Sequence, residues 1–126
     1  MDAQPIILID DDRTWLQAAG DLLRDEGFDV RTTDRSERGL ELLDYNSPVL
    51  VILDIHMPRL SGLDVLRELR RRGSRVPVLI VSGEDEAGLM AQALLEGASS
   101  FVRKPVSAEL LVRAVRRLIG SPPPLE

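Results

Sequence analysis

The sequence predicts a doubly wound α/β fold, with five parallel strands in the order 2-1-3-4-5 and five helices divided between the two faces of the sheet. The first observation is a set of short Ile, Val and Leu runs without polar alternation, typical of strands covered on both faces. The second is the helical spacing of apolar residues between those runs. Such alternation implies right-handed crossovers and a parallel sheet, and this strand order is one of the two common ones.

Five segments are expected to be strands, the first at residues 6–10 (IILID). The second, 28–32 (FDVRT), alternates apolar and polar residues and is expected at an edge of the sheet. The third and fourth, 49–53 (VLVIL) and 76–81 (VPVLIV), are apolar runs, and the fifth is 99–103 (SSFVR). Because Val, Ile and Leu fill three of these segments, the centre of the sheet should be buried on both faces.

Helices are expected in the stretches 13–27, 35–44, 62–73, 85–96 and 107–120. Glycine ends or follows four of them, where a left-handed residue would stop a helix, at Gly27, Gly73, Gly97 and Gly120. Three of the stretches carry apolar stripes, formed by Trp15, Leu16, Ala19, Leu22 and Leu23; by Leu63, Leu66 and Leu69; and by Leu110, Leu111, Ala114, Val115, Leu118 and Ile119. A solvated helix face is expected for Arg67, Arg70, Arg71 and Arg72.

The length of 126 residues, with 44% hydrophobic and 29% charged residues, indicates one globular domain, which we assign to residues 1–120. Residues 121–126 (SPPPLE) are expected to begin a linker, because three prolines cannot continue a helix. Leu125 and Glu126 at its end are alternatively residues left by cloning.

The composition excludes several classes of protein. Without cysteine there is neither a disulfide framework nor a cysteine zinc site, which suits a reducing, cytoplasmic location. We expect no signal peptide and no membrane span, since the required apolar stretches are missing. A net charge of −5 and only 3% aromatic residues argue against direct nucleic-acid binding. No GxGxxG motif follows the first strand, which argues against dinucleotide binding.

The apolar run LVILD, residues 50–54, ends on a carboxylate, which is costly to bury unless it is paired, metal-bound or hydrogen-bonded. In the predicted fold, the ligand crevice lies at the carboxyl ends of the first and third strands, where the winding direction reverses. The first strand brings Asp10, Asp11 and Asp12 to this crevice, and the third brings Asp54. We therefore expect Asp54 to be exposed at a strand end, in a pocket with the other carboxylates.

Converging carboxylates repel one another unless a cation lies among them, and such oxygen ligands favour Mg²⁺. The fourth strand should bring the Ser82 hydroxyl to the same edge of the sheet, and the fifth should bring the Lys104 amine. A carboxylate nucleophile, Mg²⁺, a lysine and a hydroxyl donor together form a site for phosphoryl transfer to aspartate.

These motifs resemble the receiver domain of response regulators in two-component signalling, which has a flavodoxin-like fold. The resemblance covers residues 6–119. Its pieces are ILIDD for the acidic pair, VILDIHMP for the phosphoacceptor turn, VLIVSG for the hydroxyl residue and GASSFVRKP for the switch aromatic residue and Lys-Pro. Each motif is weak alone, but their order and their places at strand ends are specific to this family.

The resemblance implies that Asp54 is the phosphoacceptor and a metal ligand, and that Asp11 binds Mg²⁺ directly. Asp10 would hold metal-bound water, and the backbone carbonyl of His56 would complete the coordination. Asp12 would lie in the loop that enters the first helix. The alternative for this acidic run is a helix N-cap, and both roles can hold together.

The resemblance also implies that Ser82 bonds a phosphoryl oxygen, and that Lys104 pairs with the phosphoryl group or with Asp54. Phe101 stands at the switch aromatic position, where a core-packing role is the alternative. A cis peptide bond is expected between Lys104 and Pro105.

The sequence departs from the family pattern in a few places. Gly83 follows Ser82 where alanine is common, and Val106 follows Lys-Pro where phenylalanine is common. His56 and Glu84 stand at positions that tune phosphoryl lifetime in the family, so the rate of hydrolysis stays open.

The function implied is that of a signalling phosphoacceptor, which catalyses its own phosphotransfer and slow dephosphorylation. Its partner would be a sensor histidine kinase or a phosphotransfer protein. Phosphorylation would draw in Ser82 and Phe101 and change the face formed by the fourth helix, fifth strand and fifth helix. That face would control an output domain or partner, with transcription regulation as the expected role and homodimerisation as a further possibility.

Two other functions are open at this point. One is a Mg²⁺-dependent phosphohydrolase with Asp54 as nucleophile. Haloacid-dehalogenase-like enzymes need a second acid two residues further on, where this chain has His56. The other is a receiver-like module that binds partners without phosphorylation, against which the intact set of site residues argues.

Overall fold

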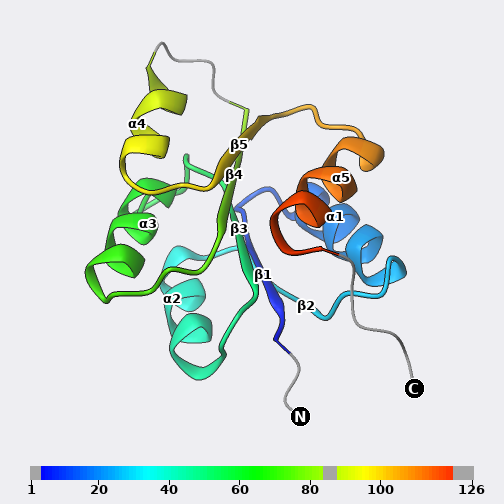
Figure 1. Ribbon diagram of the computed structural model, residues 1–126, viewed down its shortest axis with the longest axis horizontal. Helices are drawn as coiled ribbons and strands as arrows, with labels where there is room; N and C mark the ends of the chain where they lie inside the picture. The colour runs from blue at the N-terminus through cyan, green and yellow to red at the C-terminus, as the bar shows by residue number, and fades with distance from the viewer. Residues whose placement is uncertain (1–3, 84–87, 121–126) are drawn as a thin grey trace.

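The computed structural model describes residues 4–83 and 88–120 and confirms the doubly wound α/β fold (Figure 1). All strand pairs are parallel, in the order β2-β1-β3-β4-β5. The strands are β1 (Ile6–Ile9), β2 (Val30–Thr33), β3 (Leu50–Leu53), β4 (Val78–Ser82) and β5 (Ser100–Arg103). The helices are α1 (Arg13–Asp25), α2 (Ser36–Tyr45), α3 (Gly62–Arg71), α4 (Leu89–Leu95) and α5 (Ala108–Ile119).

The sheet separates two apolar cores, because successive side chains of a strand point to opposite faces. In β1, Ile7 and Ile9 belong to the core under α2, α3 and α4, whereas Ile6 and Leu8 belong to the core under α1 and α5. Figure 1 shows these two layers, with α1 and α5 on the right of the sheet and the other helices on the left. Burial on both faces explains why the central strands are continuous apolar runs.

Two strands begin two residues later than the sequence predicts. Strand β4 begins at Val78 rather than at residue 76, because Pro77 has no N–H to donate and contributes only its carbonyl, which accepts from the Val51 amide at 3.0 Å. Strand β2 begins at Val30 rather than at residue 28, because the Phe28 amide donates to the Leu23 carbonyl and closes the end of α1. The edge position of β2 is confirmed.

The helix ends are confirmed at the four predicted glycines, since Gly27, Gly73, Gly97 and Gly120 all have positive φ. The predicted α5 stripe is wrong at Leu110, which is 51% exposed. The buried residues of α5 are Leu111 and Val115, as predicted, together with Val112. Helix α4 begins at Leu89, and the earlier start predicted at residue 85 falls outside the described residues.

The prediction of a solvated arginine face on α3 is wrong for Arg70. Its Nε and Nη2 atoms donate to the Gly97 carbonyl at 3.2 and 2.8 Å, and Nη1 donates to the Ser74 carbonyl at 3.1 Å. Arg67 pairs with Glu96 at 3.1 Å. The contacts with Glu96 and Gly97 tie α3 to the carboxyl end of α4. Over 4–83 and 88–120, no helix has the length and hydropathy needed to cross a membrane.

Candidate functional site

Two neighbouring strands bring the acidic residues together. In the parallel ladder Ile9 is opposite Leu53, so Asp10 and Asp54 are the next residues of adjacent strands at the same edge of the sheet. The Asp54 amide donates to the Ile9 carbonyl at 3.0 Å and holds the two strand ends in register. The acidic residues therefore meet where the fold reverses its winding direction, as the sequence predicts.

Asp10, Asp11 and Asp54 each offer a carboxylate oxygen to one cluster, and these oxygens all lie within 4.8 Å of one another. The expectation that Asp54 is exposed is wrong, because its exposed fraction is only 7%, and Asp10 is completely buried. Of the three, only Asp11 is exposed to solvent. The cluster thus combines two buried acids with one at the surface.

The burial of these acids changes their protonation. Burial, assisted by the nearby charge of Asp10, raises the pKa of Asp54 to about 6. Burial also raises the pKa of Asp10, although its hydrogen bond with Lys104 opposes that rise. At neutral pH Asp54 is mainly ionised, as a nucleophile must be, but its charge is costly in the absence of a cation.

Lys104 pairs with Asp10 rather than with Asp54, the expected carboxylate partner. Its Nζ donates to Asp10 Oδ2 at 2.6 Å, and its side chain is only 17% exposed. Asp10 is the more deeply buried acid and therefore has the stronger need for a charged partner. The Lys104 amide donates to the Ser82 carbonyl at 3.0 Å, and the Lys104–Pro105 peptide bond is cis.

Asp12 caps α1, which confirms the N-cap alternative for this residue. Its Oδ1 accepts from the Trp15 amide at 3.1 Å, while its own amide donates to Asp10 Oδ1 at 2.9 Å. Asp12 therefore serves as the N-cap of α1, whereas Asp10 and Asp11 belong to the carboxylate cluster.

The other predicted site residues that the structure describes have different environments. Ser82 is fully buried at the end of β4. Phe101 is half-buried on β5 and packs against the core under α2, α3 and α4. His56 is exposed just beyond Asp54, and Val106 packs against the core under α1 and α5. Glu84 falls outside the described residues.

Sequence reasoning missed Gly62, at the first position of α3. A Cβ atom there would lie 2.0 Å from the Asp54 carbonyl oxygen, so only glycine lets α3 begin directly against the phosphoacceptor candidate. A signal was available, because Ser61 and Asp64 form a capping box that marks the start of this helix.

Trp15 was also missed as part of the site. The Lys104 Nζ atom lies 4.7 Å from the centroid of its ring, which is a cation–π distance. Sequence patterns contain no signal for this contact, because it depends on how α1 and the end of β5 meet in space.

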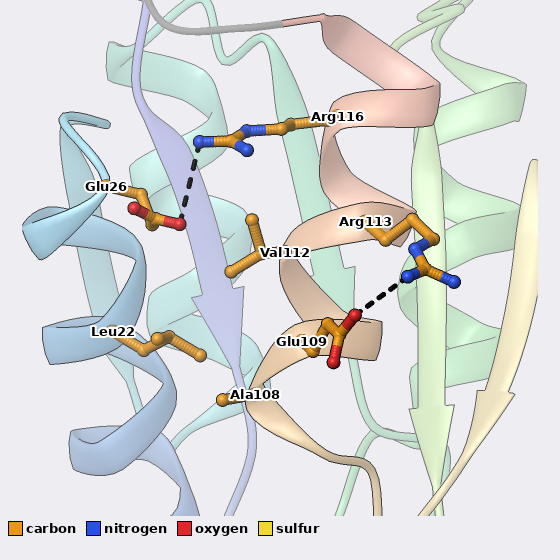
Figure 2. Close-up of a pocket in the computed structure, with 7 residues that line it drawn as sticks. All are labelled: Leu22, Glu26, Ala108, Glu109, Val112, Arg113 and Arg116. Carbon is orange, nitrogen blue, oxygen red and sulfur yellow. Dashed lines mark hydrogen bonds and ion pairs between the residues drawn. The ribbon is translucent and has the colours of Figure 1, made fainter.

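A separate pocket lies between α1 and α5 (Figure 2). Leu22, Ala108 and Val112 form its apolar part. Two ion pairs border it, Glu26 with Arg116 at 3.5 Å and Glu109 with Arg113 at 2.9 Å. Its lining includes none of the acidic cluster, and both of its carboxylates are paired with arginine, so it offers no comparable metal site.

The fold and the acidic cluster define a doubly wound α/β domain of the receiver type. The sequence profile described as the response regulator receiver domain matches residues 6–116, so the chain belongs to this family. Domains of this family bind Mg²⁺ at an acidic pocket and accept phosphate from histidine kinases. The fit of this chain to Mg²⁺ is considered below from its own residues.

Among curated proteins, the chain is 32% identical over 114 residues to the cell cycle transcriptional regulator CtrA of Caulobacter vibrioides, covering 90% of this chain and 49% of CtrA. It is 33% identical over 121 residues to the response regulator MprA of a Mycobacterium species, covering 96% of this chain and 53% of MprA. The chain thus spans about half the length of these relatives. Their names associate the family with two-component transcription regulation.

Solved structures support the same family assignment. A receiver domain protein from Clostridium thermocellum superposes with a TM-score of 0.85 at 37% identity, covering 92% of this chain and 94% of that one. The receiver domain of NtrX from Brucella abortus gives a TM-score of 0.85 at 30% identity, covering 90% of this chain and 97% of that one. The predicted family and fold are therefore confirmed.

Proposed function

We propose that this chain is a phosphoacceptor that takes a phosphoryl group onto Asp54 from the phosphohistidine of a histidine kinase or a phosphotransfer protein. The observation that carries the proposal is the cluster of three carboxylates within 4.8 Å, with the Lys104 ammonium bonded to one of them. A lysine and a group of acids at the switch point of this fold suit phosphoryl chemistry.

The residues present fit a Mg²⁺ ion. All three candidate side chains offer hard oxygen donors, and they include an exposed acid, Asp11, through which a hydrated ion can enter. Both oxygens of Asp10 already accept hydrogen bonds, from Asp12 and Lys104, which favours contact through water. The His56 carbonyl is the proposed backbone ligand. When bound, Mg²⁺ would neutralise the carboxylates and the phosphoryl oxygens.

In the proposed transfer, an ionised Asp54 oxygen forms a bond to phosphorus while the bond from phosphorus to the kinase imidazole breaks. The electron pair of that bond returns to the imidazole nitrogen. Burial holds Asp54 in place, and its pKa of about 6 leaves it ionised at neutral pH. Lys104 would offer its ammonium to the phosphoryl group, and Ser82 would offer its hydroxyl.

Phosphorylation would act on a partner through the face formed by α4, β5 and α5. A groove on this face includes Phe101 and Leu110, and α4 adds Met90, Leu94 and Leu95, of which Leu95 is 88% exposed. Exposed apolar side chains of this kind suit a protein contact. We propose that movement of Ser82 and Phe101 reshapes this face to control a transcriptional output domain or a second copy of the chain.

The test is labelling by acetyl phosphate with Mg²⁺, followed by mass spectrometry of the modified peptide. Wild type should be labelled on Asp54, and Asp54→Asn should not. Asp25→Asn, which changes an exposed acid on α1, is the matched control and should be labelled like wild type. Stoichiometric labelling of Asp54→Asn would refute the assignment.

Two further measurements separate the alternative functions. Lys104→Ala should impair labelling more than Mg²⁺ binding, and equal loss of both would count against its role. Multiple turnovers of a small phosphoester, with release of inorganic phosphate, would instead indicate a phosphohydrolase. Absence of any Mg²⁺ effect on the fluorescence of Trp15 would favour a module that works without phosphorylation.

A further inference from the structure

Lys104 is the only lysine in the sequence, and its ammonium group is held from two sides. Its Nζ donates to Asp10 Oδ2 at 2.6 Å and lies 4.7 Å from the centroid of the Trp15 ring. The negative face of an indole attracts an ammonium group at this distance, and the attraction grows when water is excluded. Because the lysine side chain is only 17% exposed, this contact is partly desolvated.

The loop that carries the acids also holds the backbone of Trp15. Its amide donates to Asp12 Oδ1, and the Asp12 amide donates to Asp10 Oδ1. The contacts thus form a closed ring that runs from Asp10 through Asp12, Trp15 and Lys104 back to Asp10. These bonds hold the backbone from which the indole extends, and the indole itself packs against the core under α1 and α5.

The two contacts of Lys104 differ in how far a cation bound by the acidic cluster would weaken them. Any cation held by the acidic cluster competes with the ammonium group for the Asp10 carboxylate. The Trp15 ring lies outside this cluster and gives Lys104 a contact that does not depend on Asp10. A lysine side chain has many rotamers, and rotamers that turn Nζ into solvent lose the ring contact.

We propose that Trp15 is a positioning residue, which keeps the ammonium group of Lys104 at the acidic crevice, ready to meet a phosphoryl group on Asp54. The inference rests on the proposed phosphoacceptor function. Trp15 touches no reacting atom in this scheme and acts only through Lys104.

The first test compares rates of phosphorylation by acetyl phosphate. Trp15→Leu keeps an apolar side chain but removes the aromatic face, and it should slow phosphorylation by roughly three- to tenfold, the range that one partly desolvated cation–π contact supports. Trp15→Phe keeps a weaker face and should give an intermediate rate. Tyr45→Leu removes an 85% exposed aromatic residue at the end of α2 and, as the matched control, should keep the wild-type rate.

A double-mutant cycle separates positioning from packing. In a Lys104→Met background the ring has no ammonium group to hold, so Trp15→Leu should cause no further slowing. The same slowing in both backgrounds would show that Trp15 only packs against the core, and it would overturn the proposal.

A second readout does not require phosphorylation. Because the chain has one lysine, ¹³C-lysine labelling gives a single ε-methylene signal in NMR spectra. The ring current of Trp15 should shift this signal in wild type, partly in Trp15→Phe and not in Trp15→Leu. An unshifted wild-type signal would overturn the proposal, even if Trp15→Leu did not fold. If wild type is not phosphorylated at all, the proposed function fails, and the shift then reports on the contact separately.

Discussion

Replacing Asp54 by asparagine should stabilise the fold when no divalent cation is present. The carboxylate is 7% exposed and shares its surroundings with Asp10, whose charge repels it. Asparagine has nearly the same shape and no charge.

The magnitude follows from the pKa of Asp54, which burial raises from 3.8 to about 6. An acid whose pKa is raised in the folded state stabilises the fold while it is protonated, and this contribution is lost as the pH rises from about 4 through about 6. Since one pKa unit corresponds to about 1.36 kcal/mol, ionisation of Asp54 costs roughly 3 kcal/mol above pH 7, and about half of that at pH 5. This is a large fraction of the stability of a small domain.

The assay is urea unfolding of wild type and Asp54→Asn in EDTA, followed by circular dichroism. The variant should be more stable by up to roughly 3 kcal/mol at pH 8, and the advantage should shrink at pH 5 and again when Mg²⁺ is added. Asp25→Asn should change stability by less than about 0.5 kcal/mol. Equal stability of wild type and Asp54→Asn at pH 8, or an advantage independent of pH, would refute the reasoning about the buried charge.

Two other predictions concern the same crevice. Mg²⁺ at about ten times its dissociation constant should stabilise wild type by about 1.4 kcal/mol in thermal unfolding, and Asp11→Asn should remove most of this gain; an undiminished gain would exclude Asp11 as a ligand. Gly62→Ala should destabilise by more than about 3 kcal/mol in urea unfolding, because its Cβ would lie 2.0 Å from the Asp54 carbonyl oxygen. Gly83→Ala is the control, since among the described residues its Cβ would meet only the Lys104 Cβ, at 4.0 Å; similar losses in both variants would contradict the steric argument.

The carboxylate cluster was predictable because it depends on local patterns and on the topology. Runs of Ile, Val and Leu mark the strands, and the register of β1 with β3 then brings Asp10 and Asp54 together. The same reasoning could not give the burial of Asp54, because that depends on how closely Gly62 brings α3 to the end of β3. Periodicity likewise placed Leu110 on the α5 stripe, although the packing of α5 leaves it exposed.

Side-chain partners were harder to predict than positions. Lys104 was expected near Asp54, yet its Nζ bonds to Asp10, because two acids compete for one ammonium group and the more deeply buried acid gains more from it. Arg70 belonged to an apparent run of surface charges, but the carbonyl of Gly97 gives it a partner from a distant turn. Such pairings depend on distances between elements, which the sequence pattern does not contain.

The choice of lysine at position 104 follows from these contacts. Of sixteen Lys and Arg residues in the chain, only this one is lysine. A guanidinium group there would tend to bind both oxygens of Asp10, one of which already accepts from the Asp12 amide. A guanidinium group would also move less readily to a new anion, because its planar N–H donors bind a carboxylate in a fixed direction. A compact ammonium group on a flexible stem can keep Asp10 neutralised and then turn to a phosphoryl group on Asp54. The site therefore needs a mobile point charge held near its target, and Asp10 and Trp15 together meet that need.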